Sequence, residues 1–161
     1  MAIVDTIEAM DEQMFYEYRY LMKMCKDLVD ALISVQSESG MWYQVVDQGS
    51  REGNYLETSA SSIISYAILK AIRLEIIPSK YEIYALKCFE DICERYLNKE
   101  DGKLVLGGIC LVAGLGGKDK RDGTFDYYMS EPIVKNEAKG VAPFLMAFTE
   151  IYRNISQQKE M

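Results

Sequence analysis

The residues best suited to chemistry lie between Trp42 and Glu57, where the segment starting at Gly49 reads Gly-Ser-Arg-Glu-Gly-Asn-Tyr-Leu-Glu. The guanidinium of Arg51 can bind a carboxylate through two parallel hydrogen bonds. The rings of Trp42 and Tyr55 offer flat faces on which a sugar can lie. This combination favours a hydroxylated anionic ligand such as an acidic sugar.

Residues able to carry out catalysis are scarce in the rest of the chain, which contains no histidine. That absence excludes Ser-His and Cys-His nucleophile pairs and histidine-ligated zinc. The glycines from Gly114 to Gly117 lack the Lys-Ser/Thr pair of a phosphate loop, so they indicate a turn. We expect no metal, no cofactor and no general acid, with Glu57 capping a helix and Glu131 accepting a loop hydrogen bond.

Composition indicates a single domain over residues 1–161, since 49% of the residues are apolar and 27% are charged. The net charge of -7 argues against a nucleic-acid partner. We expect no membrane association, because no apolar run is long enough and the acidic start is unlike a signal peptide. The four cysteines lack paired spacing and favour reduced thiols in the cytoplasm.

Helical periodicity is present in four segments, over residues 11–36, 57–74, 79–97 and 140–155. The small residues that open the second segment predict close packing or a cavity. Between the third and fourth segments lies a long stretch, 101–139, a length that is usually functional. Within it we expect short extended pieces at 104–110 and 124–128, and we expect residues 154–161 to fray.

The chain also resembles itself. Gly40-Met41-Trp42 and Gly123-Thr124-Phe125 each lead through a polar loop into an apolar helix. A unit of outer helix, glycine-aromatic loop and inner helix is typical of toroids built from stacked helical hairpins. Two such units do not close a ring.

Several motifs in conserved order and spacing resemble the unsaturated uronyl hydrolases of glycoside hydrolase families 105 and 88. The resemblance is nearer to the unsaturated rhamnogalacturonyl hydrolases, and it rests on residues 40–47, 51–61, 113–116, 121–128, 130–134 and 139–144. It implies an all-α fold that forms about half of an (α/α)6 barrel. It also implies that the chain corresponds to the C-terminal half of such an enzyme.

The resemblance further implies site residues. Arg51 matches an arginine that contacts the unsaturated uronate, and Tyr55 stands where the family usually has tryptophan. Trp42 matches an aromatic residue supporting the pocket wall, and Lys139 matches a lysine able to approach the carboxylate. Two simpler interpretations stay open: Arg51 pairing with a nearby glutamate on the surface, and Trp42 serving as a core anchor.

The resemblance leaves three functions open. In the first, the chain carries part of the substrate pocket and is inactive alone, because the family's catalytic aspartate, which serves the addition of water across the sugar double bond, lies in the N-terminal half. Alternatively, a homo-oligomer or a partner carrying the N-terminal half completes an active hydrolase of unsaturated uronic-acid oligosaccharides. In the third, the chain is a non-catalytic carbohydrate-binding or interaction module. Because half a barrel leaves apolar helix faces uncovered, we expect self-association or a partner.

Overall fold

The computed structural model describes residues 1–11, 13–118 and 121–159 of the chain. Its helices are α1 (Ala2–Ala9), α2 (Phe15–Ser34), α3 (Thr58–Arg73), the short 3-10 helix η1 (Ser79–Tyr81), α4 (Glu82–Tyr96), α5 (Phe125–Ser130) and α6 (Ala138–Lys159). Two small antiparallel hairpins complete the fold, one pairing β1 (Leu97–Glu100) with β2 (Lys103–Leu106), the other pairing β3 (Ile109–Cys110) with β4 (Ile133–Val134).

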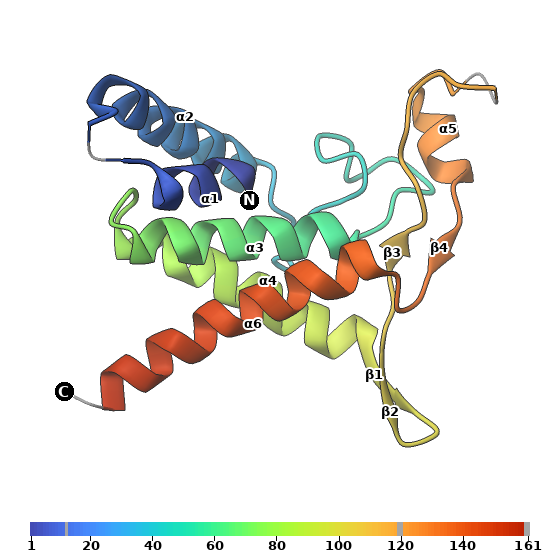
Figure 1. Ribbon diagram of the computed structural model, residues 1–161. Helices are drawn as coiled ribbons and strands as arrows, with labels where there is room; N and C mark the ends of the chain where they lie inside the picture. The colour runs from blue at the N-terminus through green and yellow to red at the C-terminus, as the bar shows by residue number, and fades with distance from the viewer. Residues whose placement is uncertain (12, 119–120, 160–161) are drawn as a thin grey trace.

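The helices form antiparallel hairpins around α3 (Figure 1). Helices α1, α3 and α6 run in one direction, and α2 and α4 return in the other. The main packing of α3 is against α4 and α6. The loops that precede α3 and α6 therefore meet at one end of the molecule. This arrangement confirms the expected mostly helical fold built as part of a helical barrel.

The small residues of α3 allow its neighbours to approach closely. Ser61 and Ser65 are fully buried, and each hydroxyl satisfies a backbone group of another segment. The Ser61 hydroxyl accepts from the backbone N–H of Trp42 at 2.9 Å, and the Ser65 hydroxyl donates to the carbonyl of Ala85 at 3.0 Å. Of the two expectations for this stretch, close packing is therefore the one the structure shows.

The N-terminal helical prediction needs correction. The residues before the expected helix form a separate helix, α1, and α2 begins at Phe15 rather than Asp11. The end of α2 also comes early, at Ser34, where the indole Nε1 of Trp42 donates to the Leu32 carbonyl at 2.7 Å. A side chain from a later loop thus binds the end of a helix that was expected to continue to Gln36.

The extended piece expected at 124–128 is wrong, because α5 occupies this stretch. Thr124 begins the helix by accepting a hydrogen bond from the backbone N–H of Tyr127 at 3.2 Å. The carboxylate of Asp122 holds Thr124 in turn, accepting from its hydroxyl at 2.8 Å and from its N–H at 3.0 Å. These local caps outweigh the strand preference of Phe125 and the tyrosines that follow it. The extended structure expected at 104–110 is confirmed by β2 and β3.

Fraying from residue 154 is also wrong, since α6 continues to Lys159; residues 160–161 lie outside the described part of the chain. The last turns of α6 are held by side chains. Asn154 donates to Glu82 at 3.2 Å, and Arg153 donates to the buried Glu150 at 3.0 Å.

A network of charged side chains ties the three parallel helices together. Lys70 on α3, with only 6% of its side chain exposed, contacts Asp5 at 2.6 Å and Glu8 at 2.7 Å on α1. Arg73, one turn further along α3, contacts Glu8 at 2.9 Å and Glu150 on α6 at 2.7 Å. The network fixes the relative position of α1, α3 and α6 at the end opposite the loops.

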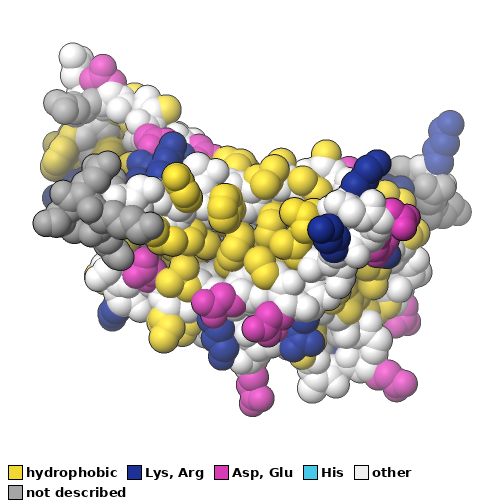
Figure 2. Space-filling model, turned by 90° about the horizontal axis from the view of Figure 1, so that it is seen from below, with side chains coloured by type: hydrophobic (Ala, Val, Ile, Leu, Met, Phe, Trp, Pro, Cys, Tyr) yellow, Lys and Arg dark blue, Asp and Glu magenta, His cyan; other side chains and the backbone are white. Residues whose placement is uncertain are grey.

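The outward face of α6 is apolar. Every third or fourth residue there is hydrophobic, and these side chains are 47% to 62% exposed: Leu145, Phe148, Tyr152 and Ile155. The Phe148 ring lies 6.4 Å from that of Phe89 on α4, so the apolar face continues onto the neighbouring helix. Figure 2, viewed from the side on which α4 and α6 lie, shows a broad hydrophobic area. We call this surface the α6 face.

Among the described residues, none of the helices combines the length and the apolar character that crossing a bilayer requires.

Candidate ligand-binding site

The loop that carries Arg51 and Tyr55 is closed at its base by backbone pairing. The N–H of Gln44 donates to the Tyr55 carbonyl at 2.8 Å, and the N–H of Glu57 donates to the Trp42 carbonyl at 2.9 Å. Inside the loop, the Asn54 side-chain amide donates to the carbonyls of Val45 at 2.9 Å and Gln48 at 2.8 Å. Asn54 therefore replaces the backbone partners that a polar loop of this length lacks.

Glu57 connects this loop to the start of α3 and to strand β3. Its side chain is fully buried and caps α3 by accepting from the backbone N–H of Ala60 at 2.6 Å. It also accepts from the Ser59 hydroxyl at 2.8 Å and from the N–H of Cys110 at 2.9 Å. The expected capping role is confirmed, and all of these bonds are structural.

Arg51 lies half-exposed at the rim of the loop. Its guanidinium stacks on the Phe125 ring, 3.7 Å from the ring centroid, and donates to the Gln48 side chain at 2.9 Å. The guanidinium also contacts Asp126 at 3.5 Å. The alternative of pairing with Glu52 or Glu57 is therefore wrong: the acidic partner comes from α5, far along the sequence.

Trp42 is a core residue with no exposed surface. A sugar ring therefore has no face of Trp42 to contact, and the suggestion of direct stacking is corrected. The indole instead donates a hydrogen bond to the carbonyl of Leu32 on α2, while the backbone carbonyl of Trp42 accepts from the N–H of Glu57. Both the core-anchor interpretation and the role of supporting the pocket wall agree with this placement.

Tyr55 is partly buried, and its hydroxyl points into the protein. Within the described residues this hydroxyl is shielded from solvent and makes no hydrogen bond of normal geometry. Burial, together with the nearby thiol of Cys110, raises the pKa of the Tyr55 phenol. The hydroxyl therefore stays protonated at neutral pH and does not act as a base.

Lys139 stands in the first turn of α6, at the same end of the molecule. Its ammonium donates to the Leu111 carbonyl and lies 3.5 Å from the carboxylate of Glu137. The side chain is 40% exposed, so the charge remains within reach of solvent. In the structure Lys139 thus stabilises the long stretch between α4 and α6 through its bond to Leu111.

Two acidic residues of the long stretch between α4 and α6, Asp122 and Glu131, have structural partners. Asp122 lies in the turn before α5, where the hydrogen bonds from Thr124 lower the pKa of its carboxyl group. Glu131 faces Arg121 at 3.9 Å. Among the described residues, no group of three histidine, cysteine, aspartate or glutamate side chains is placed to hold a metal ion.

In the structure, helix α5 contacts the loop that carries Arg51. Its residues Phe125 and Asp126 are the site neighbours that sequence reasoning missed. A signal was present, since Gly123-Thr124-Phe125 matches Gly40-Met41-Trp42 in the internal repeat. That signal identified a turn, and it did not indicate that the second turn packs on the first loop.

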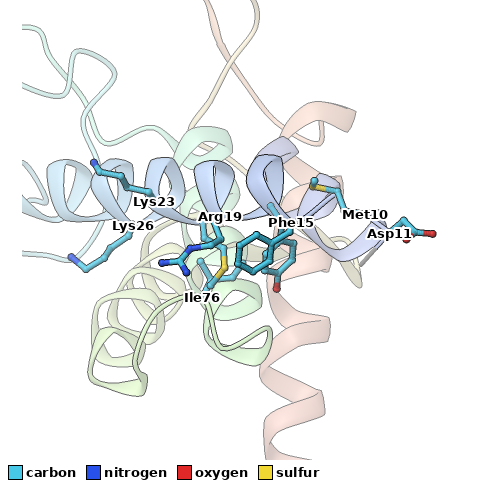
Figure 3. Close-up of a pocket in the computed structure, with 9 residues that line it drawn as sticks. Met10, Asp11, Phe15, Arg19, Lys23, Lys26 and Ile76 are labelled. Atoms are coloured by element: carbon cyan, nitrogen blue, oxygen red, sulfur yellow. The ribbon is translucent and has the colours of Figure 1, made fainter. Parts of the chain in front are cut away.

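Two hollows of the surface are not lined by Arg51, Phe125 or Asp126. A groove of about 720 Å³ runs along α2 and is lined by Met10, Phe15, Arg19, Ile76 and their neighbours (Figure 3). A second hollow of about 810 Å³ lies beside the loop, between Gln36, Tyr43, Asp47 and Arg95. None of the four predicted site residues lines either hollow.

The comparisons with known proteins give glycoside hydrolases of families 88 and 105. The model of Glycosyl Hydrolase Family 88 matches residues 1–155. Protein Atu3128 of Agrobacterium fabrum is 39% identical over 158 residues, which cover 93% of this chain and 66% of that protein.

Solved structures agree with this assignment. A glycoside hydrolase of family 105 from C. acetobutylicum ATCC 824 is 47% identical and superposes with a TM-score of 0.89, covering 93% of this chain and 42% of that one. A possible member of the GH105 family from Salmonella enterica is 27% identical, with a TM-score of 0.77 over 95% of this chain and 37% of that one. The chain therefore spans about two fifths of these solved structures.

Proposed function

Because this chain belongs to glycosyl hydrolase family 88, we propose that it supplies one wall of a site for unsaturated uronic-acid oligosaccharides, of the kind that pectin degradation releases. The observation that carries the proposal is the placement of Arg51. Its guanidinium is held at a loop rim by Phe125 and Gln48, and the side chain as a whole is 49% exposed. A positioned guanidinium of this kind suits the carboxylate of a uronate.

The rest of the proposed wall follows from the neighbouring loops. Tyr55 contributes a partly buried ring from the same loop as Arg51, and Trp42 supports the loop from the core. Lys139, on the adjoining inner helix, adds a second positive charge at the same end of the molecule. The guanidinium of Arg51 and the ammonium of Lys139 favour anionic over neutral sugars at this wall.

Catalysis by this chain alone is not part of the proposal. Glu57 is buried in a helix cap, and Asp122 and Glu131 serve the loop around α5. A general acid must reach the substrate with a pKa suited to proton transfer. We propose that the proton donor comes from outside the chain, so that the chain alone binds the sugar without hydrolysing it.

Binding and hydrolysis are tested separately. Titrating the chain with unsaturated galacturonyl disaccharide in NMR spectra should shift resonances of the loop around Arg51. Arg51→Ala should remove this effect and Arg51→Lys should weaken it, while galactose, which lacks the carboxylate, should leave the spectrum unchanged. Absence of any shift with the unsubstituted chain would refute the binding wall. Loss of the enol-ether absorbance with the chain alone would refute its inactivity.

A second candidate function is an active hydrolase completed by another chain, and the α6 face favours it. Phe148 and Tyr152 are 50% and 62% exposed, although solvent-exposed aromatic stripes are uncommon in monomers. At the far side of the fold, Phe15 and Tyr16 on α2 are 56% and 83% exposed. A second copy, or a partner equivalent to the N-terminal half, would cover these faces, and the N-terminal-half partner would also bring the missing proton donor to Arg51.

Sedimentation at micromolar concentration tests this assembly. We expect species larger than the monomer, and Phe148→Glu should shift them toward the monomer. The control is Leu104→Glu, because Leu104 is 69% exposed on the β1–β2 hairpin, away from the α6 face. A monomer at every concentration would rule out self-association, and hydrolysis would then have to appear with a purified N-terminal-half partner. If hydrolysis appears in neither case but the sugar binds, the non-catalytic carbohydrate-binding module is the function that remains.

We also propose a cytoplasmic location. Cys25, Cys88, Cys93 and Cys110 are all free thiols, as is usual in a reducing compartment. Burial raises the pKa of the Cys25, Cys88 and Cys93 thiols, which keeps them unreactive.

A further inference from the structure

The helix α5 and the loop around Arg51 are in direct contact, although more than seventy positions separate Arg51 from Phe125 in the sequence. The guanidinium lies 3.7 Å from the centroid of the Phe125 ring, and its Nη2 lies 3.5 Å from Oδ1 of Asp126. One turn further along α5, Cγ of Met129 lies 3.8 Å from the place that a Cβ atom on Gly53 would take. Helix α5 therefore covers the outer side of the loop.

The two α5 residues that contact Arg51 act on different parts of the guanidinium. The Phe125 ring covers its flat face, which restricts the orientation of the side chain and leaves the N–H edge available. Asp126 occupies part of that edge. Because the Asp126 side chain is 91% exposed, it can move into solvent when another anion takes its place.

We propose that Phe125 is a positioning residue for Arg51 and that Asp126 is a displaceable counter-ion which sets the affinity of the site for carboxylates. This inference rests on the proposed function of Arg51. An entering uronate carboxylate replaces Asp126 at Nη2, while the Phe125 ring and the Gln48 side chain keep the guanidinium in place. The affinity of the site then depends on how much more strongly the guanidinium of Arg51 binds the uronate carboxylate than the carboxylate of Asp126.

The size of the effect follows from the exposure of the groups. An exposed ion pair contributes little, so its removal should strengthen carboxylate binding by about two- to five-fold. Losing an exposed cation–π contact should weaken binding by a similar factor, about two- to five-fold, because Arg51 must then be ordered by the ligand.

The positioning role is tested first without any sugar, by following the Nε–Hε resonance of Arg51 in ¹⁵N-labelled protein. A guanidinium stacked on a ring experiences a ring-current shift. We expect this shift to disappear in Phe125→Leu, which keeps an apolar side chain of similar size, and to persist in Phe125→Tyr, which keeps the ring. An unchanged resonance in Phe125→Leu would overturn the assignment of Phe125.

The counter-ion role is tested by titrating variants with unsaturated galacturonyl disaccharide. Asp126→Asn should bind about two- to five-fold more tightly than the unsubstituted chain. The matched control is Asp47→Asn, which removes one exposed negative charge from the loop of Arg51 itself. Equal affinities for the two variants would overturn the role of Asp126, because a general charge effect would then explain the result.

These measurements keep the two proposals apart. If neither the unsubstituted chain nor Asp126→Asn binds the disaccharide, the proposed function fails and the counter-ion role fails with it. The Arg51 resonance in Phe125→Leu and Phe125→Tyr still decides whether Phe125 positions the guanidinium. If the unsubstituted chain binds and Phe125→Leu binds equally well, only the inference about Phe125 is refuted.

Discussion

Replacing Glu57 by glutamine should destabilise the fold strongly although the two side chains have nearly the same shape. Each carboxylate oxygen accepts two hydrogen bonds. Oε2 accepts from the N–H of Ala60 at 2.6 Å and the Ser59 hydroxyl at 2.9 Å. Oε1 accepts from the N–H of Cys110 at 2.9 Å and again from Ser59, at 2.8 Å. Whichever way the glutamine amide is turned, its NH₂ group faces a backbone N–H that has lost its acceptor.

The cost is the sum of two effects. A buried donor left without an acceptor costs about 1–3 kcal/mol. Loss of the negative charge at the start of α3 costs about 0.3–1 kcal/mol, and up to about 2 kcal/mol in a partly buried setting. We therefore expect the free energy of unfolding to fall by about 2–4 kcal/mol. For a domain of this size, the unfolding temperature should fall by roughly 5–15 °C.

Thermal and urea unfolding followed by circular dichroism measure this change. The control is Glu52→Gln, because Glu52 is exposed in the same segment and should change the free energy of unfolding by less than about 0.5 kcal/mol. If Glu57→Gln lowers the free energy of unfolding no more than Glu52→Gln does, the Glu57 carboxylate does not hold the Arg51 loop, α3 and β3 together, and the reasoning is refuted.

Two further predictions concern the helical framework. Burial opposes the ionisation of Asp5, but hydrogen bonds from Lys70 and Tyr66 outweigh it and lower the pKa of Asp5; its stabilisation is therefore present above the unfolded pKa and is lost as pH falls through the folded value. Unfolding temperatures should accordingly decline below about pH 4. Lys70→Met should make that decline less steep, and the same slope in both proteins would contradict this explanation. Trp42→Phe removes the 2.7 Å bond to the Leu32 carbonyl. It should lower the free energy of unfolding by about 1–3 kcal/mol in urea titrations. A loss below about 0.3 kcal/mol would show that the bond is not needed.

Much of the framework could be predicted from local sequence. Apolar residues at helical spacing located α3, α4 and the start of α6 to within a few positions, because that pattern depends only on the residues of each helix. Glu57 was identified as a cap for the same reason, since its acceptor and the first N–H groups of α3 are neighbours in sequence. The small residues of α3 likewise indicated close packing before the packing partners were known.

Errors arose where one segment is stabilised by another, and where local caps outweigh the preference of the residues that follow them. The helix α2 ends at Ser34, slightly before the expected Gln36, where the Trp42 indole from a later loop donates to the Leu32 carbonyl. Periodicity alone carries no information on such a contact. Helix α5 was missed because its start depends on the caps of Asp122 and Thr124, whereas its aromatic residues by themselves favour a strand.

By itself, the sequence determined the helices α3, α4 and the start of α6, the family, and an arginine suited to a carboxylate, since each of these depends on residue type and spacing along the chain. Only the tertiary structure decided that Trp42 is enclosed in the core, and that Arg51 lies on Phe125 and beside Asp126. Burial and ion pairing depend on which distant segments meet. Here they meet because α3 and α6 run in the same direction and bring their preceding loops to one end.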